Sequence, residues 1–255
     1  MIALSPEARA ILLVNEEDHL RIQLLLPGLA LAGHWREMLA IENRLARWLD
    51  FAYHPQYGYL TACLSNVGTG LRASVMLHLP GLAWTGRLNS TLSMWPDQVI
   101  EFRGLFGEGS GSEGTFIQLS NKTTLGADVE TIVRHVLASA QQLVDLERRA
   151  RDQILQRTPM ALKDQVFRAF GLLSSARLIS SREATAHLSL LRLGSCLGIL
   201  GNLTPAEVLR LLVGIRPAHL QIQLEEPLSA ERRDEIRATH LRSQMNLFVE
   251  NRDDG

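Results

Sequence analysis

The feature that most constrains the fold is a change in sequence pattern near residue 126. Residues 127–156, ADVETIVRHVLASAQQLVDLERRARDQILQ, repeat apolar side chains at helical spacing and predict one long amphipathic helix that ends at Thr158-Pro159. Short apolar runs and glycine-rich turns come before this helix, and only helix signals come after it. The pattern predicts an α+β half followed by an all-helical module, with a boundary between residues 150 and 160.

The first half contains both strand and helix signals. Residues 33–51 have apolar side chains at helical spacing, and residues 70–94 look helical with a kink or break at Pro80. Residues 107–114, GEGSGSEG, form a glycine/serine loop. Strands are predicted where β-branched and aromatic residues are enriched, in ARAILLVN (8–15), GYLTACLS (58–65), QVIEFRGLFG (98–107) and TFIQLSN (115–121).

In the second half of the sequence, capping residues indicate where helices begin. Thr204 is followed by a proline and then by Glu207, which fits a capping box. Ser180 with Glu183 fits the same pattern, and Ser229 can cap the last helix. These signals predict helices that begin at residues 181, 205 and 230.

Composition and charge exclude several classes of protein. The formal net charge is −1, so no overall basic field favours nucleic acid as a partner. The first residues do not form a signal peptide, and the longest apolar runs are too short to cross a membrane. The only two cysteines, Cys63 and Cys196, indicate free thiols in a reducing compartment. We therefore expect a cytoplasmic protein, and the scattered histidines predict no metal site.

Polar clusters occur at the ends of predicted strands and in glycine turns, where functional sites are usually built. Several arginines there would suit an anion such as a triphosphate, and the amides of GTGLRAS would suit phosphate oxygens. The glutamates would suit a metal, an amine or a guanidinium group. The clusters are NEEDHLR (15–21), CLSNVGTGLRASVM (63–76), RGLFGEGSGSEG (103–114) and LSNK (119–122).

Each cluster also has an ordinary structural explanation. NEEDHLR alone would most often be a solvated turn, and a lone cysteine such as Cys63 would most often be a small buried residue. RRDEIRATHLR, 232–242, would be an ordinary charged helix face. The order of the clusters along the chain distinguishes these readings.

NEEDHLR, then C-x-S-N-x-G-T-G-x-R-A-S-V, then RGxxGE…SNK…LG is similar to the motif series of the ATP:guanidino phosphotransferases. Within that family the chain most resembles the bacterial protein-arginine kinases, because its helical module follows the catalytic sheet. The resemblance implies an antiparallel phosphagen-kinase sheet of the glutamine-synthetase-like type, flanked by helices and followed by an all-α domain. We expect a catalytic domain at 1–152 and a helical regulatory, phosphoarginine-binding domain at 153–255.

The resemblance also implies roles for single residues. Glu17 and Glu108 would hold and deprotonate the substrate guanidinium, and Cys63 would be the reactive cysteine beside it. Magnesium would bridge the phosphate oxygens of ATP, with few direct protein ligands. The residues implied to bind ATP are Arg21, Arg72, Ala73, Ser74, Val75, Met76, Arg103, Gly104, Leu105, Phe106, Gly107 and Glu108.

The motif RDEIRA, residues 233–238, matches the family's RDxxRA motif for phosphoarginine at an allosteric site. Arg233 and Arg237 would lie on one helix face and could hold one phosphate together. The residues implied for this site are Arg233, Asp234, Glu235, Ile236, Arg237 and Ala238.

The sequence departs from the family pattern in two places. Family members carry an arginine motif, S-[ST]-R-x-R-x-x-R-N, before NEEDH, and the printed sequence starts after that point. We therefore expect missing strands, an exposed apolar sheet face, an unpaired edge and weak or no kinase activity. Truncation or a misplaced start is favoured over a degenerate paralogue. Leu64 stands where the family usually has proline, which affects the placement of Cys63.

The resemblance implies an ATP-dependent kinase of protein arginine side chains that marks proteins for Clp-type proteolysis in stress responses. Its expected partners are proteins with exposed arginine, a zinc-binding activator protein, a Clp ATPase and a second copy of the chain in a homodimer. Two alternatives stay open. The chain could be an impaired form that binds phosphoarginine or acts as a scaffold, or it could be a kinase for free arginine or another small guanidino compound.

Overall fold

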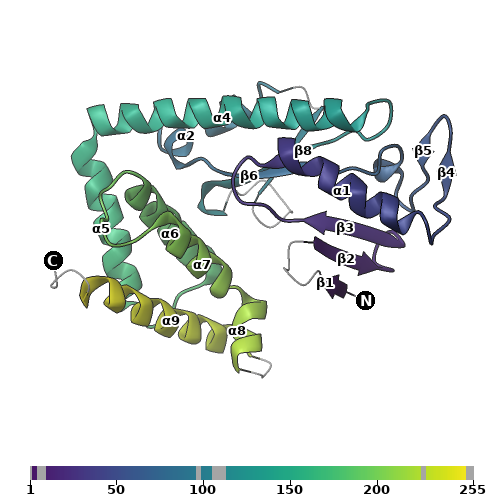
Figure 1. Ribbon diagram of the computed structural model, residues 1–255. Coiled ribbons are helices and arrows are strands. Elements are labelled where there is room, and N and C mark those ends of the chain that lie inside the picture. Colours follow the sequence, from purple (N-terminus) through teal and green to yellow (C-terminus); the bar gives the residue numbers. More distant parts are fainter. Residues whose placement is uncertain (1, 5–9, 96–98, 105–112, 225–227, 251–255) are drawn as a thin grey trace. The chain divides into compact units, whose positions relative to one another are not determined.

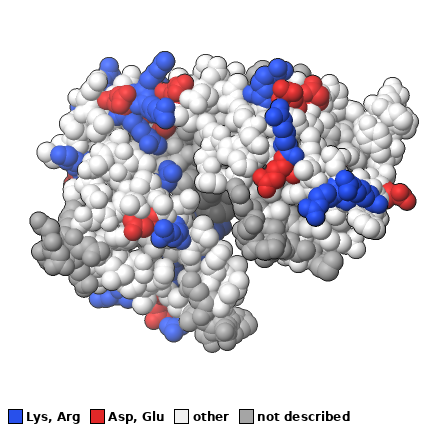
Figure 2. All heavy atoms as spheres, viewed as in Figure 1, with Lys and Arg blue, Asp and Glu red and all other residues white. Residues whose placement is uncertain are grey.

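The computed structural model describes residues 2–4, 10–95, 99–104, 113–224 and 228–250. The chain forms two compact units, which are described separately. The first unit consists of Met1–Leu77, Asn89–Arg103 and Ile117–Asp145, and the second of His78–Leu88, Gly104–Phe116 and Leu146–Gly255. Figure 2 shows basic and acidic side chains interspersed on the face in view, in keeping with the net charge of −1.

A three-stranded antiparallel sheet forms the start of the first unit, with the strand order β1-β2-β3 (Figure 1). The strands are β1 (Ile2–Leu4), β2 (Ala10–Val14) and β3 (Leu20–Leu24), and Leu12 pairs with Ile22. All residues of β2 and β3 are half-buried. Helix α1 (Leu31–Leu45) packs against β3, and a short hairpin of β4 (Tyr53–His54) and β5 (Gly58–Tyr59) follows.

A second three-stranded sheet has the order β6-β8-β7. It consists of β6 (Ser74–His78), β7 (Ile100–Gly104) and β8 (Phe116–Asn121), and almost all of its residues belong to the first unit. The central strand β8 is the most buried, and Leu119 on it is completely buried. Ser120 and Asn121 lie at the C-terminal end of this strand and belong to the LSNK cluster.

The helical prediction for residues 70–94 is wrong over its first part. Residues 74–78 form strand β6, in which Val75 and Leu77 are buried and Met76 is exposed. This alternation has the period of a strand, and the short apolar run does not reveal it without its neighbours. Pro80 begins helix α2 (Pro80–Trp84) at its first turn and does not kink a longer helix; α3 (Leu88–Leu92) follows.

The strand prediction for residues 58–65 is also wrong beyond Tyr59. The chain turns away from an extended course and forms a short 3-10 helix, η1 (Leu64–Asn66). The hydroxyl of Thr61 donates to the Cys63 carbonyl at 2.7 Å, and the Asn66 N–H donates to the same carbonyl at 3.0 Å. Local side-chain and turn bonds therefore replace the ladder bonds of a strand here.

The helical prediction for residues 127–156 and the predicted caps are confirmed. Helix α4 (Val129–Arg157) ends before Thr158, and α5 (Pro159–Ser175), α6 (Ser181–Cys196) and α7 (Pro205–Gly214) follow. Thr204 and Glu207 form a complete capping box, and Ser180 and Ser229 accept bonds from backbone N–H groups of the helices that they precede. The last helices are α8 (Pro217–Leu224) and α9 (Ala230–Glu250).

The core of the second unit lies between α5, α6, α7 and α9, where α5 packs against both α6 and α9. The described helices include none that is long and apolar enough to cross a membrane. The residues that line this core include Leu162, Val166, Leu173, Leu188, Leu191, Val208, Leu212, Leu241 and Met245.

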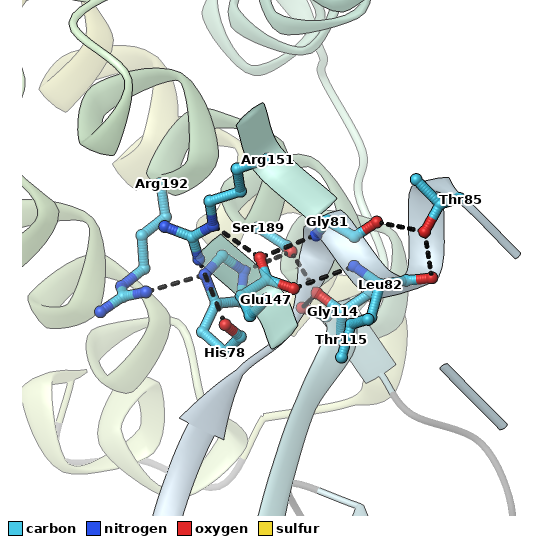
Figure 3. A network of polar contacts seen from close by, with 10 residues as sticks. All are labelled: His78, Gly81, Leu82, Thr85, Gly114, Thr115, Glu147, Arg151, Ser189 and Arg192. Carbon is cyan, nitrogen blue, oxygen red and sulfur yellow. Dashed lines mark hydrogen bonds and ion pairs between the residues drawn. The ribbon is translucent and has the colours of Figure 1, made fainter. Parts of the chain in front are cut away.

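A buried polar network joins the start of α2 to α4 within the second unit (Figure 3). The carboxylate of Glu147 accepts bonds from the backbone N–H groups of Gly81 at 2.8 Å and Leu82 at 2.9 Å. It also accepts a hydrogen bond from Nε of Arg151 at 2.6 Å. Glu147 is 4% exposed, and its charge is balanced by the half-buried Arg151 and by the N–H groups of a helix start.

The same network continues to His78 (Figure 3). Arg192 donates to Nδ1 of His78 at 2.7 Å, and a guanidinium group has no acceptor, so the proton of the neutral ring is on Nε2. Nε2 then donates to the Ser189 hydroxyl at 2.8 Å. Burial, together with the charges of Arg192 and Arg151, holds the pKa of His78 well below its usual value.

Beside this network, the 3-10 segment η2 (Glu113–Thr115) contacts α6. Gly114 has φ 64, and an added Cβ there would press on Thr185. The Thr115 hydroxyl lies 3.1 Å from the Ser189 hydroxyl and donates to the Gly114 carbonyl at 2.6 Å. The predicted loop at residues 107–114 lies largely outside the described residues.

Candidate active site

The NEEDHLR cluster forms the tight turn between β2 and β3. Asn15 has φ 55, a conformation that asparagine tolerates better than most residues, and its N–H donates to the His19 carbonyl at 2.9 Å. Arg21, at the start of β3, donates to Glu16 at 2.6 Å and to Glu17 at 3.2 Å. Glu17 therefore already contacts a guanidinium group, that of Arg21, on an exposed turn.

Asp18 attaches this turn to the loop that carries Cys63. One carboxylate oxygen accepts the backbone N–H of Ala62 at 2.7 Å, and the other accepts the side-chain amide of Asn66 at 2.8 Å. Ala62 and Asn66, each more than forty positions after Asp18 in the sequence, thus hold the turn in place. The sulfur of Cys63 lies 3.0 Å from the Ser65 hydroxyl. Through Asp18, the structure places the turn that carries Glu17 and Arg21 next to the loop that carries Cys63.

Glycines allow three chain segments to meet behind the Cys63 loop. Gly68 and Tyr59 exchange backbone hydrogen bonds at 2.7 and 3.2 Å. A Cβ on Gly58 would overlap the backbone of Gly68, and a Cβ on Gly68 would overlap the backbone of Thr124. Thr124 closes the arrangement, because its hydroxyl donates to the Val67 carbonyl at 2.6 Å. Only glycine fits this close approach at positions 58 and 68, which accounts for the first glycine of N-x-G-T-G.

Asn121, in the LSNK cluster, fixes the segment that leads into β6. Its side-chain oxygen accepts the N–H of Ala73 at 2.7 Å, and its side-chain amide donates to the Leu71 carbonyl at 2.9 Å. Asn121 is 6% exposed, so both bonds form away from solvent. The Arg72 backbone is held between these two bonds, which orients the arginine side chain.

Arg72 and Arg103 meet at one carboxylate. Nη2 of Arg72 donates to Glu101 at 3.0 Å and to the Ser120 hydroxyl at 2.9 Å. Nη2 of Arg103 donates to the other oxygen of Glu101 at 2.9 Å. Burial acts to raise the pKa of Glu101, but the hydrogen bonds and charges of Arg103 and Arg72 outweigh it, so the pKa is lowered. Glu101 therefore stays ionised between two cations.

The remaining residues implied for ATP binding have unequal access to a ligand. Met76 is 47% exposed, whereas Ala73 and Val75 are buried in the sheet. Ser74 is half-buried, and Gly104 ends β7. Leu105, Phe106, Gly107 and Glu108 lie outside the described residues. Within the described residues, no group of three or more His, Cys, Asp or Glu side chains could hold a metal ion.

The RDEIRA motif lies at the start of α9 in the second unit. Arg237 is 1% exposed, and it donates to the carbonyls of Ile215 at 3.0 Å and Ile179 at 2.8 Å and to the Asp234 carboxylate. Arg233 is half-buried and donates to the Leu228 carbonyl at 2.7 Å. The two arginines thus bind different acceptors, and Arg237 fastens α9 to two other segments.

The other residues of this motif differ in exposure. Ala238 is buried beside Arg237, and Ile236 is half-buried. Glu235 is exposed and pairs with Arg232 at 2.5 Å. Asp234 has a side chain that is 36% exposed, and its backbone carbonyl accepts the Ile179 N–H at 3.3 Å. A ligand at this motif would meet Arg233 and Asp234 before Arg237.

Sequence reasoning missed three residues that organise the site. Glu101 is separated from Arg72 by 29 positions, and Asp18 from Asn66 by 48, so no local pattern reveals either pairing. Thr124 bonds to a segment 57 positions earlier. Only the alternation in IEFRG, which places Glu101 and Arg103 on one face of a strand, could have pointed to Glu101, and only through its pairing with Arg103.

Two family models match the chain, one over each half of the sequence. Residues 1–150 match the family model described as ATP:guanido phosphotransferase, C-terminal catalytic domain. Residues 159–254 match the model described as protein-arginine kinase McsB C-terminal domain. The chain belongs to the ATP:guanido phosphotransferase family, which confirms the resemblance and the α+β fold class inferred from the motifs.

Similar curated proteins are named protein-arginine kinases. The one from Shouchella clausii is 41% identical over 253 residues, which cover 99% of this chain and 71% of that protein. The one from Brevibacillus brevis is 41% identical over 236 residues, which cover 92% of this chain and 66% of that protein. The chain thus spans about two thirds of the length of these curated relatives.

A solved structure supports the same fold. The duplicated taurocyamine kinase from Schistosoma mansoni, solved with bound transition state analog components, is 27% identical with a TM-score of 0.52. The similarity covers 65% of this chain and 24% of that one. A phosphagen-kinase fold therefore carries the NEEDHLR turn and the contact of Arg72 and Arg103 with Glu101.

Proposed function

We propose that the chain acts as an ATP-dependent protein-arginine kinase that transfers the γ-phosphoryl group of ATP to arginine side chains of proteins. The observation that carries this proposal is the pairing of a guanidinium-binding turn with an arginine pair in one unit. Glu17 contacts the guanidinium group of Arg21, and Arg72 and Arg103 share the carboxylate of Glu101. Membership of the guanidino phosphotransferase family and similarity to named protein-arginine kinases support it.

The chemistry requires a carboxylate next to the substrate nitrogen. A protonated guanidinium is a poor nucleophile because its lone pairs are delocalised. Glu17 and Glu108 would align one nitrogen with the γ-phosphorus and accept its proton as the new N–P bond forms and the bond to ADP breaks. Cys63 would lie beside the guanidinium. The exposed position of Glu17 on the turn leaves it accessible to an arginine of another protein.

The phosphates require cations on the other side of the reacting atoms. Arg21, Arg72 and Arg103 would neutralise the phosphates of ATP and the charge that develops in transfer. Segments 72–76 and 103–108 would line the nucleotide. The donors of the arginine pair are chemically suited to phosphate oxygens. Magnesium would neutralise phosphate charge when bound and would take most of its ligands from the nucleotide and water.

The helical module would bind phosphoarginine at residues 233–238, with Arg233 and Asp234 facing the ligand. We place this regulatory domain at 153–255, after a catalytic domain at 1–152. By analogy with the family, the proposed partners are proteins with exposed arginine, a zinc-binding activator, a Clp ATPase and a second copy of the chain. The proposed setting is stress-response proteolysis in the cytoplasm.

A phosphorylation assay tests the proposal. The chain is incubated with γ-labelled ATP and an arginine-rich protein, and acid-labile label on the protein is measured. We expect weak label with the wild-type chain, and with Glu17→Gln a further loss of about a hundredfold or more, the size typical of a lost general base. Glu37→Gln, on the exposed face of α1, is the matched control and should retain activity.

Other results would support the alternatives. Label on free arginine but not on protein would favour a small-molecule guanidino kinase. No label, combined with saturable phosphoarginine binding that Arg233→Ala abolishes, would leave a phosphoarginine-binding protein. Label that persists in full with Glu17→Gln would contradict the role given to that carboxylate.

A further inference from the structure

Glu101 holds the two arginines of the proposed nucleotide site with one carboxylate. Its two oxygens each accept one guanidinium, from Arg72 at 3.0 Å and from Arg103 at 2.9 Å. The side chains of the arginines are 43% and 42% exposed, and that of Glu101 is 28% exposed. A single anion therefore spans two cations at a face that solvent reaches.

The sheet dictates this geometry. Glu101 and Arg103 are two positions apart on β7, so their side chains lie on the same face. Arg72 lies just before β6, on the far side of the central strand β8. Ser120 on β8 accepts from Arg72 at 2.9 Å and supports its course across the strand. The contact is thus built by three strands and is not an accidental pairing of neighbours in sequence.

The chemistry of the contact is that of a phosphate site with its ligand already present. Carboxylate and phosphate oxygens bind guanidinium groups through the same parallel N–H donors. The three side chains carry a net charge of +1, because one anion faces two cations. The lowered pKa of Glu101 is consistent with a carboxylate that stays charged in this place.

We propose that Glu101 is an internal anion that occupies the phosphate-binding groups of Arg72 and Arg103, and that a nucleotide polyphosphate binds by displacing it. This inference rests on the proposed function, which assigns the two arginines to ATP. A polyphosphate carries several negative charges and replaces a single carboxylate, so it wins the exchange. The displaced carboxylate then lies close to the bound phosphates and lowers their affinity.

The experiment compares polyphosphate affinities of the full chain by isothermal titration calorimetry. The probe is inorganic tripolyphosphate, which contains no nucleobase, followed by ATP. Glu101→Gln keeps the size of the side chain and removes its charge. We expect its dissociation constant for tripolyphosphate to fall about tenfold, equivalent to about 1.4 kcal/mol. Arg72→Gln should weaken binding, and Glu37→Gln, which removes one exposed charge on α1, should leave it unchanged.

Opposite results overturn the inference. An unchanged or weaker tripolyphosphate affinity in Glu101→Gln would show that the carboxylate positions the arginines and does not compete with phosphate. Absence of binding by both wild type and Glu101→Gln would also overturn it, because the variant should expose two unopposed arginines. Circular dichroism and the unfolding midpoint identify a variant that fails to fold, and Glu101→Ala then provides a second charge removal.

The inference and the proposed function fail differently. If Glu101→Gln tightens tripolyphosphate binding but no variant phosphorylates arginine, the internal anion stands and the kinase proposal falls. If the wild-type chain phosphorylates protein arginine and Glu101→Gln leaves polyphosphate affinity unchanged, the kinase stands and the internal anion falls. Polyphosphate binding by Glu101→Gln thus tests the internal anion, and arginine phosphorylation tests the kinase proposal.

Discussion

Glu101 in the first unit and Glu147 in the second both bind arginine, but their surroundings differ. Glu101 is at a face that solvent reaches, with a side chain 28% exposed, and it bridges Arg72 and Arg103. Glu147 has a side chain 5% exposed and caps the start of α2 while it binds Arg151. The comparison teaches that exposure, and not residue type, separates an ion pair that can exchange its partner from one that holds the fold.

The largest effect is expected from a substitution of Glu147, the buried glutamate of this comparison. Glu147→Gln should lower the free energy of unfolding by about 3 kcal/mol, because it removes the carboxylate that pairs with Arg151 and puts a neutral amide in front of two backbone N–H donors. Urea unfolding followed by circular dichroism measures the change. A loss below about 1 kcal/mol would show that this network relaxes like a surface pair.

A pH effect of intermediate size tests the histidine of the same network. The pKa of His78 is lowered in the folded state. The folded chain therefore binds a proton at this histidine only at a lower pH than the unfolded chain, which binds it below about pH 6.5. Stability is therefore complete above that pH and falls as the pH decreases, by at most about 1.4 kcal/mol per pH unit. Arg151, Arg192 and Glu147 are the charged groups of this network.

The measurement is urea unfolding between pH 5 and pH 8 with the wild-type chain and His78→Gln. His187 and His240 also have lowered pKa values and act in the same direction, so the informative quantity is the difference between the two proteins. The variant should show a flatter decline. Equal slopes in both proteins would place the proton uptake elsewhere.

The smallest expected effect belongs to the exposed side. Glu101→Gln should change the free energy of unfolding by less than about 1 kcal/mol, because pairs open to solvent contribute little to stability. The same denaturation series measures it beside Glu147→Gln. A cost as large as that of the buried substitution would erase the distinction between the two glutamates and would make Glu101 a structural residue.

Local rules accounted for most of the helical module. Proline at the first turn of α5 and α7 and the capping box of Thr204 and Glu207 are written within a few neighbouring residues, and the structure confirms them. Strand β6 was not predicted because its three apolar residues, Val75, Met76 and Leu77, are consecutive and show no alternation in the sequence itself. Whether Val75 faces a core depends on β8, which is more than forty positions away along the chain.

The candidate site shows the same division between local and distant information. Arg72 and Arg103 were recognisable from their motifs, whereas Glu101 acquires its importance only when the sheet brings the two arginines to it. Asp18 stood inside a recognised motif, yet its partners lie elsewhere: Asn66 belongs to the second motif, and Ala62 directly precedes it. Motifs therefore indicated which residues matter chemically, and the fold decided which of them meet. The roles given to Glu17, Glu108 and Cys63 stay predictions.

Arg237 has a consequence for genetics. It belongs to the RDEIRA motif, which the family resemblance implies to bind phosphoarginine, yet its guanidinium is buried and donates to the carbonyls of Ile179 and Ile215. An allele that replaces it would deplete the protein from the cell before any question of ligand recognition arose. A separation-of-function allele is better sought at Arg233, whose side chain is only half-buried, so that abundance and recognition can be scored as independent phenotypes.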